Sequence, residues 1–135
     1  MGEPGTGDSS GSGLAPGRPR PAAAVWLWFA LAVAVNLIVV FWPSIPAGAP
    51  RLFPHADKLA HAAVFAAVAY TGRRARLPLV PLVLALTVHA VESELVQQYL
   101  LSGRSGDPAD SVADLIGMCA GCVLPVTGFA DRLTL

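Results

Sequence analysis

Ionisable and amide side chains occur in three short groups, each at one end of an apolar stretch. Their members are Asp57, Lys58, His61, Glu94, Gln97, Arg104, Asp110 and Asp114. Residues three or four apart share a helix face, so each group can present its side chains together. His61, Glu94 and Asp114 lie a turn or more inside apolar stretches, where an unpaired charge costs several kcal/mol. We therefore interpret the three groups as one polar pocket rather than as solvated helix ends.

Metal binding is one chemistry that fits such a pocket. Carboxylate and imidazole groups are ligands for divalent cations, and a cation would relieve the repulsion between neighbouring carboxylates. The residues concerned are Asp57, His61, Glu94, Asp110 and Asp114. The sequence has no compact metal motif such as H-E-x-x-H, so a divalent cation is one candidate cofactor and the cofactor stays unassigned.

Two other readings compete with metal binding, and an enzyme could combine these readings. Lys58, Arg104 and two helix N-termini suit the phosphate of an anionic headgroup. In an enzyme, His61 or Glu94 would act as general acid or base. No Ser or Cys nucleophile stands among these residues, which argues against a covalent mechanism. The same charges could instead form internal salt bridges that only staple the helices together. The residues leave catalysis, binding and a purely structural role open.

The elements that must position this pocket are apolar helices. The 135 residues are 54% hydrophobic and 13% charged, with mean hydropathy +0.58, whereas soluble domains carry about a quarter charged residues. Four apolar stretches, at about 22–42, 57–71, 77–100 and 108–127, predict an all-α integral membrane four-helix bundle over residues 21–135. The Gly-, Ser- and Pro-rich residues 1–20 predict a disordered tail. A net charge of zero argues against nucleic acid as a partner.

Positive charges predict the orientation of the bundle. The apolar run of the first stretch exceeds the length of a signal-peptide core and further stretches follow, so we expect an uncleaved span. With a cytoplasmic N-terminus, six of the nine basic residues fall inside, as the positive-inside rule requires: Arg18, Arg20, Arg73, Arg74, Arg76 and Arg132. We expect a multi-pass plasma-membrane protein with both termini cytoplasmic and the pocket on the outer side.

Small and polar residues predict how the helices meet. Gly117 and Gly121 are four apart and should let the fourth helix pack closely on the second or third. Cys119 and Cys122 lie in the same small-residue stretch and are interpreted as packing residues. His89 and Glu92 lie on another face of the third helix, and this face is expected to meet Asn36 or a second copy of the chain.

The same residues also follow a family pattern. Asp57-Lys58-Leu59-Ala60-His61 resembles the D-K-x-x-H signature of VanZ-like membrane proteins, and Glu94-Leu95-Val96-Gln97 resembles their E-x-x-Q. Four residues match the spacing of the family's R-x(5)-D-x(6)-G-x(3)-G stretch: Arg104, Asp110, Gly117 and Gly121. Asp114 stands where the family often has Asn. The resemblance covers about residues 25–127 and implies a role linked to low-level glycopeptide (teicoplanin) resistance in Gram-positive bacteria.

Taken together, these observations predict a bacterial VanZ-like membrane protein acting in cell-envelope homeostasis or glycopeptide tolerance. Its pocket would bind or process an anionic lipid-linked envelope component. His61 and Glu94 are the candidate acid–base residues. The candidate binding residues are Asp57, Lys58, Gln97, Arg104, Asp110 and Asp114. The alternative is a non-catalytic structural or partner-binding membrane protein whose charges form a stapling network.

Overall fold

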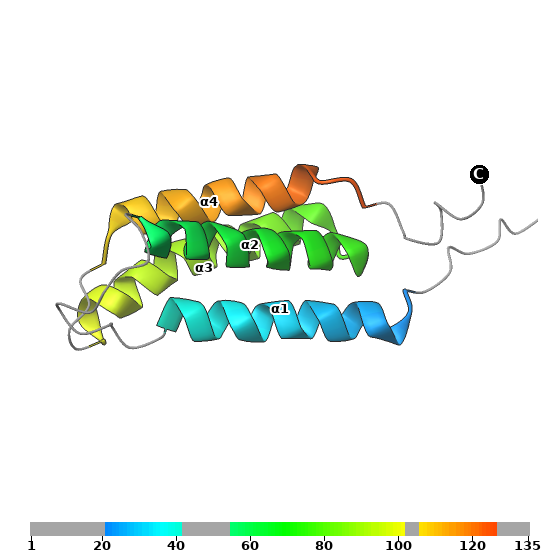
Figure 1. Cartoon of the computed structure of the whole chain (residues 1–135), viewed down its shortest axis with the longest axis horizontal. Helices are drawn as coiled ribbons and strands as arrows, with labels where there is room; N and C mark the ends of the chain where they lie inside the picture. Colours follow the sequence, from blue (N-terminus) through cyan, green and yellow to red (C-terminus); the bar gives the residue numbers. More distant parts are fainter. Residues whose placement is uncertain (1–20, 42–54, 102–105, 127–135) are drawn as a thin grey trace, which may run out of the picture.

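The chain forms four α-helices in a computed structural model that describes residues 21–41, 55–101 and 106–126. In chain order they are α1 (Ala23–Phe41), α2 (Ala56–Arg74), α3 (Leu79–Tyr99) and α4 (Pro108–Val123). Their axes run roughly along one direction, so they form an elongated bundle (Figure 1). The predicted all-α four-helix architecture is confirmed. The predicted tail at 1–20 lies outside the described residues.

Local signals explain where the helices begin and end. The Asp107 side chain caps α4 by accepting a hydrogen bond from the Ala109 N–H at 2.9 Å, and Pro108 takes the first helical position. α4 ends at Val123, earlier than the expected residue 127, because Pro125 disfavours a helical conformation at Leu124. α2 has 19 residues, and its last turn carries Arg73 and Arg74, which complement the helix dipole. α2 thus begins one residue before the expected stretch 57–71 and ends three residues after it.

Backbone proximity between α2 and α4 organises the bundle. A Cβ atom added to Gly117 would overlap the Ala62 carbonyl of α2 and lie 2.7 Å from the Ala62 Cα. One turn later, a Cβ at Gly121 would overlap the Ala66 carbonyl and lie 2.9 Å from the Ala69 Cβ. The two glycines thus let α4 lie directly on the backbone of α2, which is how close helix pairs form in apolar surroundings.

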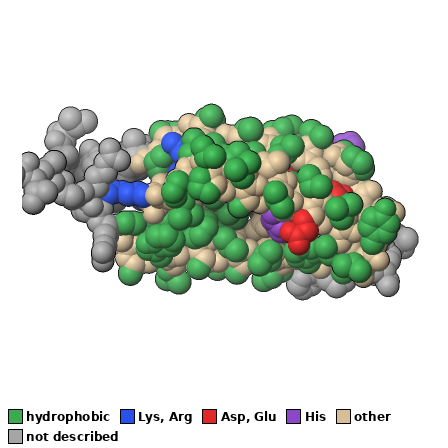
Figure 2. Space-filling view, turned by 180° about the vertical axis from the view of Figure 1, so that it is seen from behind, with side chains coloured by type: hydrophobic (Ala, Val, Ile, Leu, Met, Phe, Trp, Pro, Cys, Tyr) green, Lys and Arg blue, Asp and Glu red, His purple; other side chains and the backbone are tan. Residues whose placement is uncertain are grey.

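The apolar core is narrow and the outer surface is strongly hydrophobic. The core residues come from all four helices, and Phe65 and Ala90 are fully buried within it. Outside it, hydrophobic side chains cover most of the face seen in Figure 2. Leu27, Val88 and Ile116 are each more than 60% exposed. α1 and α3 are long and apolar enough to cross a membrane, with mean hydropathies of 2.5 and 1.7.

Candidate functional site

A buried imidazole–carboxylate pair joins α2 to α4. His61 Nδ1 lies 3.1 Å from Asp114 Oδ1, and the two side chains are 2% and 0% exposed. A carboxylate oxygen accepts hydrogen bonds, so the pair forms in the tautomer that carries hydrogen on Nδ1. That bond orients the ring. His61 and Asp114 are 53 residues apart, and the Gly117–Ala62 approach brings their helices together.

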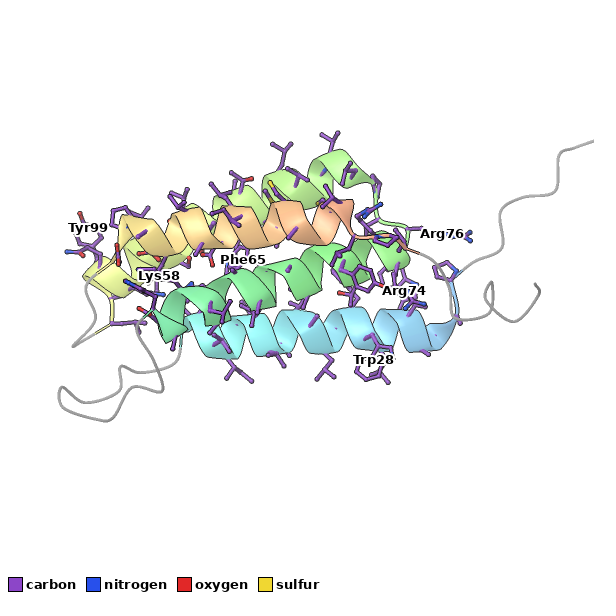
Figure 3. The ribbon with its side chains drawn as sticks, turned by 45° about the horizontal axis from the view of Figure 1, so that its top comes forward. Trp28, Lys58, Phe65, Arg74, Arg76 and Tyr99 are labelled. Atoms are coloured by element: carbon purple, nitrogen blue, oxygen red, sulfur yellow. The ribbon has the colours of Figure 1, made fainter. Side chains whose placement is uncertain are left out.

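Lys58 forms a second link between the same helices, nearer the end of the bundle (Figure 3). Its Nζ atom donates to Asp107 Oδ2 at 2.6 Å and to Asp110 Oδ1 at 2.8 Å. The bond from Lys58, with a smaller contribution from the Ala109 N–H, lowers the pKa of Asp107 below its ordinary value of 3.8. Lys58 is only one quarter exposed, so its charge is largely committed to these aspartates.

Glu94 connects the end of α3 to the start of α4. Its Oε2 atom accepts a hydrogen bond from the Asp107 N–H at 2.6 Å, and Gln98 Oε1 accepts one from the Gly106 N–H at 2.8 Å. The Glu94 carboxylate is close enough to His61, Asp110 and Asp114 to interact with their charges. We define the polar end cluster as Lys58, His61, Glu94, Asp107, Asp110 and Asp114. Four of its six side chains are carboxylates.

Two carboxylate oxygens of the polar end cluster are buried without a donor. Neither Glu94 Oε1 nor Asp114 Oδ2 has a hydrogen-bond partner among the described residues. A buried carboxylate oxygen that lacks a donor costs free energy, on the order of 1–3 kcal/mol or more. Such atoms are suited to accept hydrogen bonds from hydroxyl or amino groups of a ligand.

The remaining predicted site residues occupy different positions. Gln97 is 1% exposed, and its Nε2 donates to the Val40 carbonyl at 2.9 Å, which ties α3 to the last turn of α1. Asp57 is exposed in the first turn of α2 and forms no ion pair within the described part of the chain. Arg104 lies outside the described residues. Gly117 and Gly121 belong to α4 and pack against the backbone of α2.

The structure bears on two of the sequence-based chemical readings. In the ranges that the structure describes, no group of three or more His, Cys, Asp or Glu side chains is arranged to hold a metal ion. The carboxylates are instead distributed between Lys58, His61 and the α4 backbone. The N-terminus of α4 was also expected to offer free N–H groups to an anion, but Asp107 already accepts from Ala109 N–H there. A carboxylate cap disfavours a second anion at the same position.

Asp107 is a residue whose tertiary contact the sequence does not reveal. Its position before Pro108 indicates a helix cap, and it also pairs with Lys58, which is 49 residues away along the chain. No local pattern predicts that contact. Ser111 is a second such residue, because its hydroxyl donates to the Ala90 carbonyl at 3.1 Å and links α4 to α3.

The face of α3 that carries His89 meets Asn36 of α1, which is one of the two contacts predicted for this face. His89 Nε2 lies 2.9 Å from Asn36 Oδ1, and its ring stacks on Phe65 with centroids 5.5 Å apart. His89 is therefore part of the bundle interior between α1, α2 and α3. Glu92 is exposed, and contact of its face with a second copy stays a prediction.

Comparisons with protein-family models, curated proteins and solved structures gave no match to this chain.

Proposed function

We propose that this chain is a four-span membrane protein of the VanZ-like kind whose polar end cluster binds or processes a lipid-linked component of the cell envelope. The observation that carries the proposal is the pair of buried carboxylate oxygens, Glu94 Oε1 and Asp114 Oδ2, that have no donor among the described residues, together with the His61 imidazole on Asp114. A sugar–phosphate lipid has hydroxyl donors for those oxygens. The resemblance of the Asp57–His61 and Glu94–Gln97 segments to VanZ-like motifs supports a role at the cell envelope.

Membrane insertion is supported by the distribution of apolar and charged residues. α1 and α3 are long enough to span, and only 11% and 22% of their apolar windows are buried inside the protein. Lipid is the solvent that accommodates such extensive exposed apolar surface. Arg73, Arg74 and Arg76 gather at the end of the bundle opposite the polar end cluster, which favours a cytoplasmic location for that end.

Cysteine labelling in intact cells tests this topology. Tyr99 and Pro78 are exposed residues at opposite ends of α3, so a cysteine at each reports one side of the membrane. In a background lacking Cys119 and Cys122, we expect an impermeant maleimide to label Tyr99→Cys and not Pro78→Cys. Labelling of Pro78→Cys alone would put the polar end cluster in the cytoplasm, and an envelope substrate would then be excluded.

In the catalytic form of the proposal, His61 is the general base and Asp114 is its positioning residue. Asp114 is predicted to bind substrate, and its hydrogen bond with His61 Nδ1 supports a positioning role through the imidazole. The ring would take a proton from a substrate hydroxyl or water, and Glu94 would contact the same substrate through Oε1. An anionic group would be held by Arg104, because Lys58 is already bound by two aspartates.

The Glu94→Gln variant tests whether the cluster acts in function. The amide keeps the shape of the side chain and retains an oxygen to accept from the Asp107 N–H, so we expect normal folding. If Glu94 serves as acid or base, turnover falls by about a hundredfold or more. In a susceptible Gram-positive host expressing the chain, teicoplanin tolerance should then return to the level of the host without the gene. Full tolerance with Glu94→Gln would reject an acid–base role for Glu94.

A stapling network is the second candidate function, and the two ion pairs of Lys58 favour it specifically. Lys58→Gln removes both links to α4 and leaves the buried Asp110 unpaired, so we expect about 2 kcal/mol less stability. Because its folded-state pKa is lowered, Asp107 stabilises the fold above pH 3.8, and this contribution is lost as pH falls through the lower folded-state value. Lys58→Gln should weaken that acid dependence.

SDS titration in detergent micelles, followed by circular dichroism at several pH values, measures both effects, and Lys58→Arg is the control that keeps the charge. If the charged residues only hold the helices together, teicoplanin tolerance should fall only in variants whose stability falls. Loss of tolerance in Glu94→Gln at unchanged stability would contradict the staple.

A further inference from the structure

A second polar–apolar site lies at the other end of the bundle, away from the polar end cluster. A groove of about 390 Å³ runs between the start of α1 and the end of α2. Its lining is mostly apolar, and its residues are Ala24, Val25, Trp28, Tyr70, Thr71 and Arg74. In Figure 3, Trp28 and Arg74 lie at this end, and Lys58 lies at the opposite end.

The chemistry of the groove combines one cation with an apolar floor. The Arg74 guanidinium lies over the Tyr70 ring, 6.0 Å from its centroid. Arg74 is exposed and forms no ion pair within the described residues, so its N–H donors can meet an anion. The Thr71 hydroxyl donates to the Ala67 carbonyl at 2.7 Å, so its hydrogen is already used within α2. None of the lining residues is acidic.

Exposed aromatic and basic residues indicate that this groove faces the boundary between lipid and water. Trp28 is 63% exposed, and tryptophan prefers the boundary between lipid and water. Arg73 and Arg76 add positive charge at the same helix end, although the Arg73 guanidinium donates to the Leu124 carbonyl at 2.9 Å. Basic grooves between helices at the cytoplasmic side of a membrane are suited to anionic lipid headgroups.

We propose that this groove holds one anionic phospholipid of the cytoplasmic leaflet, with its phosphate on Arg74 and an acyl chain along Ala24, Val25 and Trp28. The proposal rests on the membrane insertion proposed above and is independent of any activity of the polar end cluster. Charge selects the ligand, because a zwitterionic lipid has the same acyl chains and carries a cation that Arg74 would repel.

Fluorescence quenching of Trp28 tests this site in the full chain. The Trp26→Phe and Trp42→Phe changes leave Trp28 as the only tryptophan. The protein is reconstituted in phosphatidylcholine vesicles that contain a small fraction of either brominated phosphatidylglycerol or brominated phosphatidylcholine. We expect phosphatidylglycerol to be preferred at Trp28 by about fivefold, the factor for one basic side chain at an anionic surface. Arg74→Gln should reduce the preference to about one, and Arg74→Lys should retain most of it.

Arg76→Gln is the matched control, because Arg76 is basic and exposed at the same end but does not line the groove. Equal loss of preference in Arg76→Gln and Arg74→Gln would indicate general surface attraction and overturn the proposal. Equal quenching by the two lipids in the parent protein would also overturn it. Quenching by neither lipid would mean that another part of the chain fills the groove. Flotation of the vesicles reports insertion separately, so failure of the membrane proposal and failure of the lipid site are distinguishable.

Discussion

Gly117→Ala is expected to destabilise the bundle by about 3 kcal/mol. The added Cβ would overlap the Ala62 carbonyl and lie 2.6 Å from its carbonyl carbon, so the obstacle is the backbone of α2 rather than a movable side chain. Overpacking of this kind costs roughly 1–3 kcal/mol, and relief here requires α2 and α4 to separate. SDS titration followed by circular dichroism measures the loss. The separation should also lengthen the His61–Asp114 contact and reduce function.

Gly72→Ala is the matched control for this prediction. A Cβ at Gly72 would meet the two terminal methyl groups of Leu82 at 3.0 and 3.1 Å and the Phe29 ring edge at 3.2 Å. Side-chain ends can move by a few tenths of an ångström, and alanine gains about 1 kcal/mol of helix propensity over glycine. We therefore expect little change in stability. A similar large loss of stability at both positions would mean that the loss at Gly117 does not come from the close approach of α4 to the α2 backbone.

Asp114→Ala has the second large expected effect, a loss of about 3 kcal/mol of stability together with loss of function. Asp114 is fully buried, and its removal leaves His61 Nδ1–H without this acceptor in an apolar interior. Removal of one partner from a buried pair costs about 3–5 kcal/mol. The same SDS titration measures stability, and teicoplanin tolerance of the expressing host tests the proposed function.

Asp114→Asn separates the two effects. The amide oxygen still accepts from Nδ1–H and the volume is unchanged, so we expect stability within about 1 kcal/mol of the parent. Function should be retained if orientation of His61 is the role of this position. Stability retained with tolerance lost would instead show that the negative charge of Asp114 acts in function. Equal destabilisation by Asn and Ala would contradict the hydrogen bond as the stabilising interaction.

Much of the fold follows from local patterns in the sequence. Apolar stretches of helical length predict four helices, and Asp107 with Pro108 predicts the start of α4 to the residue. The ends of α2 and α4 are less predictable, because Arg73 and Arg74 continue a helix that hydropathy alone would end. The sequence also groups His61, Glu94 and Asp114 by type and spacing, without specifying which atoms meet.

The sequence by itself determined the helices, their apolar surfaces and the location of the polar residues near helix ends. These properties depend on residues within a turn or two of one another. Only the tertiary structure decided the pairing of His61 with Asp114, the sharing of Lys58 between Asp107 and Asp110, and the use of Gln97 on Val40. The physical reason is the distance along the chain. Those contacts join residues about 50 positions apart, and the ones between α2 and α4 form because Gly117 lets α4 lie on the backbone of α2.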